Sequence, residues 1–280
     1  MYLVIEFNSI NCSLKPLSLN ILFLICLFMA EIVDLVDKIK KYYKFTSYEL
    51  KGLIIAILAV AFIISFKEWG ISTFDFKSGL FNLFNAVLIV ALSILVHDAG
   101  QRLAGLAAGY RVEFKLWTFG LITALIIAFL SNGNLWLIVP SGFMLHILAG
   151  HRLGWFRYNI NYFGQAMVAL AGPLFTLMLI IFLKILSAFS TSLLVEKAIM
   201  FNVVYAITSM LPIPPLDGSK IYFGSRMLYA FVMPAIVAST ILLMIKNIPV
   251  ILALALSLLA AIVLWITYYI SFERDAWKGP

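Results

Sequence analysis

The sequence has little charge. Charged side chains make up 12% of the 280 residues, apolar ones make up 64%, and the mean hydropathy is +1.05. Because ordinary soluble domains carry roughly 25% charged residues, this shortage excludes a soluble globular domain. An apolar excess along nearly the whole chain predicts a polytopic membrane protein with membrane lipid as its first partner.

Cysteine is scarce, and several common motifs are missing. Cys12 and Cys26 have neither metal-binding nor redox spacing. The sequence shows no repeat of about 20 to 50 residues, no coiled-coil heptads, no Walker loop and no dinucleotide-binding glycine pattern. The net charge is +7, and most of the Lys and Arg residues lie between apolar blocks. Such residues set membrane orientation, so we expect no nucleic-acid partner.

The apolar blocks indicate an all-α membrane domain. A helix needs about 20 apolar residues to cross a hydrocarbon core of about 30 Å. Two shorter blocks, 119–130 and 135–149, flank a polar turn and predict a short re-entrant or membrane-spanning hairpin. The blocks that predict six transmembrane helices are 50–66, 80–97, 165–186, 198–212, 227–245 and 248–270.

The distribution of basic residues predicts that both termini are cytoplasmic, in a cell membrane. Inside loops carry more Lys and Arg than outside loops in membrane proteins. If the segment before residue 50 is inside, five basic residues lie outside: Lys67, Lys77, Lys184, Lys197 and Lys246. The fourteen that then lie inside are Lys38, Lys40, Lys41, Lys44, Lys51, Arg102, Arg111, Lys115, Arg152, Arg157, Lys220, Arg226, Arg274 and Lys278.

The chain outside the membrane domain divides into short segments. Residues 1–28 form an upstream extension or a short apolar segment, and translation starting at Met29 is one explanation of it. Residues 29–49 read as a cytoplasmic amphipathic lead. The transmembrane domain follows over residues 50–270, and residues 271–280 form a polar cytoplasmic tail.

Two acidic residues stand out because they end apolar blocks, where ionisable groups are costly and mark functional sites. Asp98 follows His97, and Gln101 shares a helical face with His97 at the i, i+4 spacing. Asp217 lies in LPIPPLDGSKI, where prolines prevent a continuous helix. The predicted topology brings His97 and Asp217 to the same side. The alternatives are a helix-end pair, a turn aspartate, and a metal-free hydrogen bond between Gln101 and Asp217.

These motifs resemble the site-2 protease family of intramembrane zinc metalloproteases. LVHDAGQRLAG resembles its H-E-x-x-H helix, MLPIPPLDGSKI its aspartate signature, and FGQAMVALAGPLFTLML its Gly-Pro stretch. The resemblance covers residues 48–229, with a protease-like core over about 80–229. It implies that His97 is the first zinc ligand, that Asp217 is the third, and that Asp98 stands in place of the general-base Glu.

The sequence departs from the family pattern at four positions. Gln101 replaces the second His ligand and Asp98 is one methylene shorter than Glu, while Thr176 and Ser209 stand where the family usually has Asn. A Gln amide is a weak zinc ligand, because zinc prefers imidazole, thiolate and carboxylate. A rescue is conceivable through His146 or His151, but their i, i+5 spacing lets at most one contribute.

The leading hypothesis is a site-2-protease-like membrane protein with a degenerate metal site and lost or altered peptidase activity. Such a protein binds a transmembrane helix as substrate or client. The first alternative is an active intramembrane zinc metalloendopeptidase with a non-standard ligand set, namely His97, Asp217 and a substitute such as Gln101, and with Asp98 activating water. A second alternative is a small-solute or ion carrier that uses the two aspartates as a relay.

Overall fold

A computed structural model describes residues 32–69, 75–148, 161–189 and 192–274. The chain divides into two units, residues 1–43 and 44–280. In the first unit the structure describes one helix, over residues 32–42. The predicted extension over residues 1–28 and the loop that carries His151 lie outside the described residues.

Within the described ranges, five helices are long and apolar enough to cross a membrane. They confirm that the chain is a multi-helix membrane protein, and each coincides with one of the predicted blocks. In chain order they are α2 (Ser47–Ser65), extended by the 3-10 turn η1 (Phe66–Glu68), α3 (Phe76–Ala107), α5 (Tyr162–Phe189), α8 (Arg226–Met244) and α9 (Val250–Tyr268), which ends in a π-helical turn η3 (Tyr269–Glu273).

The sixth predicted span corresponds to a shorter helix, α6 (Leu193–Ser209). Its 17 residues reach about 25 Å at 1.5 Å per residue. It begins with a charged turn that contains Glu196 and Lys197. The full count of six spans therefore stays a prediction. The sidedness of the termini and the boundaries of the tail also stay predictions.

The two segments predicted as a hairpin adopt different structures. The first forms helix α4 (Thr118–Leu130). In the second, strand β2 (Ser141–Ile147) pairs antiparallel with strand β1 (Tyr110–Leu116), with Phe114 opposite Phe143. Backbone N–H and C=O groups in an apolar layer must form their hydrogen bonds within the protein. Pro140 disfavours a helix at the start of this segment, and pairing with β1 satisfies the backbone of β2 instead. The two-stranded sheet was not predicted from the sequence.

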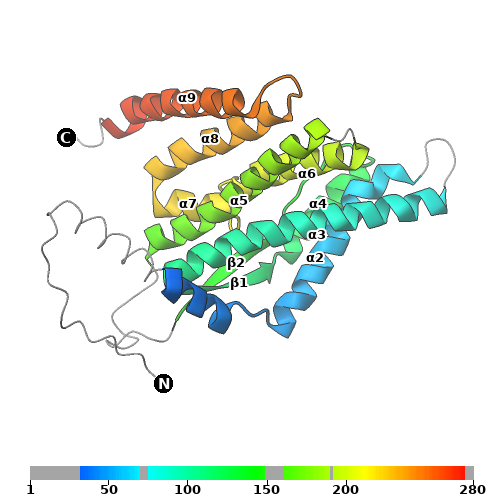
Figure 1. Cartoon of the computed structure of the whole chain (residues 1–280), viewed down its shortest axis with the longest axis horizontal. Coiled ribbons are helices and arrows are strands. Elements are labelled where there is room, and N and C mark those ends of the chain that lie inside the picture. The colour runs from blue at the N-terminus through cyan, green and yellow to red at the C-terminus, as the bar shows by residue number, and fades with distance from the viewer. Residues whose placement is uncertain (1–31, 70–74, 149–160, 190–191, 275–280) are drawn as a thin grey trace, which may run out of the picture. The chain divides into compact units, whose positions relative to one another are not determined.

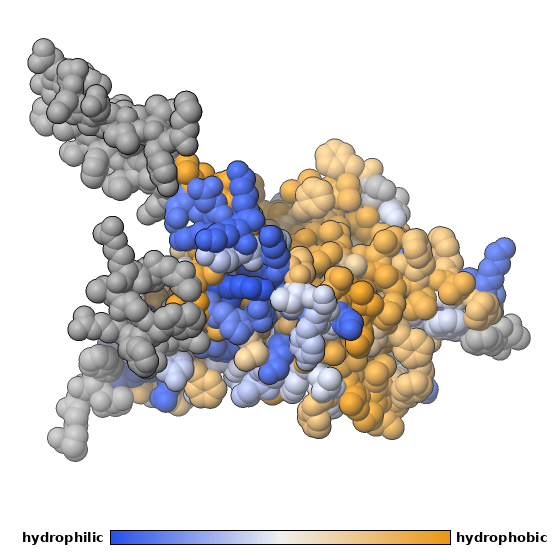
Figure 2. Space-filling view, turned by 90° about the horizontal axis from the view of Figure 1, so that it is seen from below, coloured by the Kyte–Doolittle hydropathy of each residue, from blue (hydrophilic) through white to orange (hydrophobic). Residues whose placement is uncertain are grey.

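Helices α3 and α5 lie side by side at the centre of the second unit (Figure 1). A side chain at Gly100 would meet the Phe175 ring and lie 2.9 Å from the Ala171 carbonyl, so only glycine allows this approach. The outer surfaces of the helices are apolar, and Figure 2 shows hydrophobic side chains over a broad part of the face in view. This surface suits contact with lipid chains.

The Pro-rich segment after α6 folds back to begin a short helix, α7 (Asp217–Gly224). Met210 ends α6, and a side chain at Gly218 would lie 2.6 Å from the Leu211 carbonyl. The Ser219 hydroxyl donates a hydrogen bond to the Leu216 carbonyl at 2.7 Å. These contacts fix the position of Asp217, the first residue of α7, beside the end of α6.

Candidate functional site

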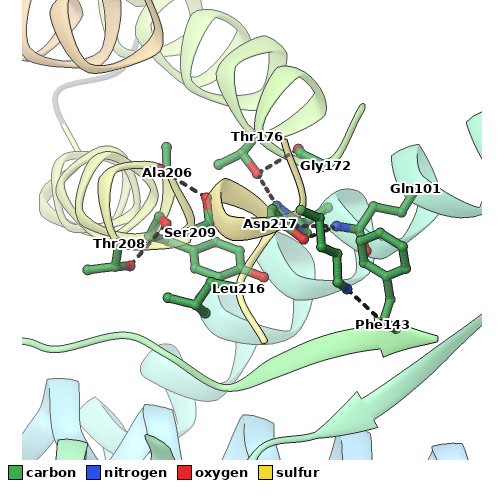
Figure 3. Close-up of polar contacts among 12 residues, drawn as sticks. Gln101, Phe143, Gly172, Thr176, Ala206, Thr208, Ser209, Leu216 and Asp217 are labelled. Atoms are coloured by element: carbon green, nitrogen blue, oxygen red, sulfur yellow. Dashed lines mark hydrogen bonds and ion pairs between the residues drawn. The ribbon is translucent and has the colours of Figure 1, made fainter. Parts of the chain in front are cut away.

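His97 and Asp217, which are 120 residues apart in the sequence, meet inside the protein. His97 Nε2 lies 2.9 Å from Asp217 Oδ2, and both side chains are only 7% exposed. The Gln101 amide nitrogen lies 2.8 Å from Asp217 Oδ1 and 3.2 Å from His97 Nε2. Three of the four candidate residues are therefore in mutual contact, and Figure 3 shows Gln101 of α3 turned toward Asp217.

Thr176 of α5 holds the other side of the imidazole. Its hydroxyl donates to the Gly172 carbonyl at 3.2 Å (Figure 3). The same oxygen lies 2.9 Å from His97 Nδ1. Because the single hydroxyl proton is used on Gly172, the oxygen accepts a hydrogen bond from Nδ1–H. The four residues His97, Gln101, Thr176 and Asp217 are called the imidazole cluster below.

The contact between His97 Nε2 and Asp217 Oδ2 requires a proton. A bare nitrogen lone pair and a carboxylate oxygen at 2.9 Å would repel each other. Since Nδ1 already carries a proton for Thr176, the contact is satisfied when one further proton lies between His97 and Asp217. The cluster then closes on itself as a hydrogen-bonded network that includes the Gln101 amide.

The order of hydroxyl, imidazole and carboxylate in this cluster matches that of a nucleophilic triad. Thr176 cannot act as the nucleophile, however, because a substrate cannot reach its hydroxyl. A triad nucleophile must reach its substrate. Thr176 is completely buried, and it does not line the cavity beside His97. Its hydroxyl therefore orients the imidazole.

A small cavity of about 10 Å³ adjoins the cluster, which is about the volume that one water molecule requires. Its polar lining residues are His97, Asp98, Gln101, Ser141, Tyr205, Ser209 and Asp217. Gly142 and Pro140 close it from β2 and the segment before it. The cavity brings all four candidate site residues to one place, although their roles stay predictions.

Asp98 is held by a different set of partners. Its Oδ2 accepts a hydrogen bond from Arg102 Nε at 2.5 Å, and Arg102 Nη2 donates to Glu49 Oε1 at 2.7 Å. Glu49 Oε1 also accepts from the Phe114 backbone N–H of β1 at 2.9 Å. All three charged side chains are at most 5% exposed. Glu49, Asp98 and Arg102 are called the arginine cluster below.

Sequence reasoning missed Glu49 and Arg102. Glu49 was assigned to the polar lead before the membrane domain, yet it is the N3 residue of a capping box with Thr46 at the start of α2. Thr46-x-x-Glu49 before an apolar run is a sequence signal for such a box. For Arg102, the signal was its i, i+4 spacing from Asp98, which favours an ion pair on one helix face.

The histidines considered as substitute ligands do not supply one in the described structure. His146 lies on β2 opposite Arg111 of β1, and its Nε2 is 3.0 Å from Glu113 Oε2. Its side chain is half exposed and does not line the cavity. His151 lies outside the described residues.

The donors in the described part of the chain do not fit a catalytic zinc centre. Such centres use three protein ligands from His, Cys, Asp and Glu, and leave a fourth position for water. Among the described residues no group of three such side chains could hold a metal. The imidazole cluster offers one imidazole, one carboxylate and one amide, and its donor atoms already bond to one another.

Gly172 positions the cluster from the side of α5. A side chain there would overlap His97 Nε2 and lie 2.7 Å from the Gln101 amide nitrogen. The absence of a side chain at Gly172 therefore allows α3 and α5 to approach closely here. Lys220, one turn after Asp217 on α7, donates to the Phe143 carbonyl of β2 at 2.8 Å. Burial lowers the pKa of Lys220 to about 8, with the charge of Asp217 opposing that shift.

Comparison with known proteins finds a metalloprotease relative. The chain is 26% identical over 195 residues to "Putative zinc metalloprotease MJ0611" of Methanocaldococcus jannaschii, which covers 68% of this chain and 91% of that protein. No family model matches the sequence. No solved structure matches it. The relative supports a metalloprotease-like relationship for this membrane protein.

Proposed function

We propose that this chain is a site-2-protease-like membrane protein in which a hydrogen-bonded cluster replaces the catalytic zinc. The observation that carries the proposal is the position of Gln101, whose amide nitrogen lies 2.8 Å from Asp217 Oδ1. Zinc would need the His97 Nε2 lone pair and the Asp217 carboxylate at the same time. Both are engaged by each other and by Gln101, so a metal must displace an intact network.

The position of Asp98 supports a loss of peptidase activity. A general base must lie within hydrogen-bond reach of the water that it activates and must be able to accept its proton. The Asp98 carboxylate is instead paired with Arg102, whose Nε lies 2.5 Å from Oδ2. The pair with Arg102 must break, or the side chain must turn, before this oxygen can orient a water beside His97.

A groove beside the site supports the binding of a client transmembrane helix. It has a volume of about 420 Å³ and lies between the sheet and the Pro-rich segment. Its lining is mainly apolar and consists of Lys115, Leu116, Trp117, Gly142, Phe143, Met144, Pro214 and Pro215. Gly142 lines both this groove and the small cavity. A client in the groove would therefore lie next to the imidazole cluster.

Metal analysis of the purified chain tests the proposal. We expect the protein, loaded with excess zinc and then desalted, to retain far less than one zinc per chain. Gln101→His restores a second imidazole at i+4, and this variant is expected to retain about one zinc. The matched control is the double variant His97→Ala/Gln101→His, which should lose it. One zinc per unmodified chain that disappears in His97→Ala would overturn the proposal.

Incubation with a model transmembrane substrate completes the test. We expect no cleavage by the unmodified chain, and we expect photo-crosslinks from a probe at Met144 in the groove to the substrate helix. Cleavage that Asp98→Asn abolishes would instead establish an active metallopeptidase. Absence of crosslinks from Met144, with the protein folded, would contradict helix binding in the groove.

A second candidate is an active zinc endopeptidase, which the hydrogen bond between His97 Nδ1 and Thr176 favours. Metal-binding histidines commonly donate their second ring N–H to such an oxygen, leaving Nε2 for the metal. In this case His97, Asp217 and the Gln101 amide oxygen would hold zinc. The same metal analysis distinguishes the two candidates.

A further inference from the structure

The helix over residues 32–42 has an amphipathic surface that the proposed function does not use. At 100° per residue, one stripe of the helix carries Ile32, Leu35, Val36, Ile39 and Tyr42. The opposite face carries Asp34, Asp37 and Lys41. Such a two-sided helix needs a boundary between apolar and aqueous surroundings.

Part of this apolar stripe is exposed in the described structure, while Leu35, Ile39 and Tyr42 are partly buried. Val36 is 42% exposed, and Ile32 is 39% exposed. Val33, at the edge of the stripe, is 58% exposed. Burial of branched aliphatic side chains away from water is favourable, so we expect the exposed part of this stripe to contact an apolar partner.

Two lysines border the apolar stripe on opposite sides. On the helical wheel, Lys38 lies about 40° beyond Tyr42 and Lys40 lies about 40° beyond Val36. The Lys38 amine forms an ion pair with Asp34 one turn earlier, at 2.6 Å. Lys40 is exposed and can lay its aliphatic stem along an apolar surface and extend its amine into a polar layer. This arrangement is typical of helices that lie in the headgroup region of a bilayer.

The chain itself keeps this helix close to a membrane. Four residues, 43–46, separate its end from Ser47, where the membrane-crossing helix α2 begins. Even fully extended, four residues span only about 14 Å. The net charge of the segment also favours an anionic surface, because Lys38, Lys40, Lys41 and Lys44 outnumber Asp34 and Asp37.

We propose that the helix over residues 32–42 lies on the bilayer surface, with its apolar stripe among the acyl chains and its lysines on anionic phospholipid headgroups. The bordering lysines and the short connection to α2 favour a lipid surface over a protein partner. The anionic charge of the lipids strengthens docking, since each basic residue near such a surface contributes about 1 kcal/mol, or about fivefold in the docked population.

Depth-dependent fluorescence quenching of the full chain in nanodiscs tests this. The native cysteines are replaced (Cys12→Ser, Cys26→Ser), and an environment-sensitive dye is attached at Val36→Cys on the apolar stripe. The matched control carries the dye at Asp37→Cys, one residue along and on the polar face. The discs contain phosphatidylcholine with about 30% phosphatidylglycerol, and a spin label high on the acyl chain serves as quencher.

We expect strong quenching at position 36 and weak quenching at position 37. Replacing the charges (Lys40→Gln, Lys41→Gln, Lys44→Gln) should weaken quenching at position 36, as should discs of phosphatidylcholine alone. Equal quenching at both positions would overturn the proposal. So would a dye at position 36 that is shielded from water but not quenched by the labelled lipid, because that result would indicate a protein contact.

Discussion

The imidazole cluster and the arginine cluster each take two residues from the same two turns of α3, yet their buried polar groups are stabilised in different ways. In the imidazole cluster, hydrogen bonds of 2.8 to 2.9 Å join a ring, an amide, a hydroxyl and one carboxylate. In the arginine cluster, two buried carboxylates share a single guanidinium. The comparison shows that His97 and Asp98, adjacent in the sequence, serve different structures because successive helical residues point about 100° apart.

The two clusters also join different elements. The imidazole cluster connects α3 to α5 and α7, and so it holds the Asp217 turn in place. The arginine cluster connects α3 to α2 and, through Glu49 and the Phe114 N–H, to β1. The first cluster corresponds to the position of the expected metal centre. The second holds the sheet that closes the cavity.

The largest expected effect comes from removing the guanidinium of the arginine cluster. Arg102→Met leaves Glu49 and Asp98 buried without their cation, and breaking a buried ion pair in this way costs about 3–5 kcal/mol. Unfolding of the purified protein in mild detergent, followed by denaturant titration, measures the loss.

The matched control for that variant neutralises the whole cluster. Glu49→Gln/Asp98→Asn/Arg102→Met removes all three charges, and most of the stability should return because no buried charge remains unpaired. An Arg102→Met variant as stable as the unmodified protein would show that the ion pairs are solvated, and the contrast between the clusters would disappear.

An intermediate effect is expected where α5 meets the imidazole cluster. Gly172→Ala places a methyl group against His97 and Gln101, and overpacking of this kind costs about 1–3 kcal/mol. The control is Gly164→Ala on the same helix, where the nearest atom to the added carbon is an ordinary 3.5 Å away. Thermal denaturation should separate the two variants; equal melting temperatures would place the α3–α5 contact elsewhere.

The smallest expected effect is the loss of the Thr176 hydroxyl. Thr176→Val removes the acceptor for His97 Nδ1–H and should cost about 1 kcal/mol, the scale of one buried hydrogen bond. Nitrogen NMR of the imidazole should show a change in the proton distribution between Nδ1 and Nε2. Thr176→Ser keeps the hydroxyl and should behave as the unmodified protein, whereas an unchanged spectrum in Thr176→Val would refute the contact.

The helices were largely predictable from the sequence, because length and hydropathy decide which segments can cross an apolar layer. Five predicted blocks coincide with helices of spanning length. The sheet was not predictable in this way. Strand β2 reads as a short apolar block, and only its pairing with β1 reveals it as a strand. Periodicity within one segment contains no information about a partner in another segment.

The candidate site was predictable in part. The meeting of His97 with Asp217 follows from where their apolar blocks end, and Gln101 follows from the i, i+4 spacing. The contact of Thr176 with the imidazole, and the Glu49 partner of Arg102, depend on how neighbouring helices rotate against each other. Rotation is set by packing at positions such as Gly100 and Gly172, which local sequence patterns do not encode.

The sequence by itself determined that this chain is a membrane protein with two carboxylates at the ends of apolar blocks, because a shortage of charge leaves lipid as the solvent for its helices. It also determined which donor atoms are available, since His97, Gln101 and Asp217 contribute an imidazole, an amide and a carboxylate. Only the tertiary structure decided how those donors are used. Packing of α3 against α5 and α7 turns His97, Gln101 and Asp217 toward one another, while α2 brings Glu49 to Arg102 and so ties Asp98 to a guanidinium.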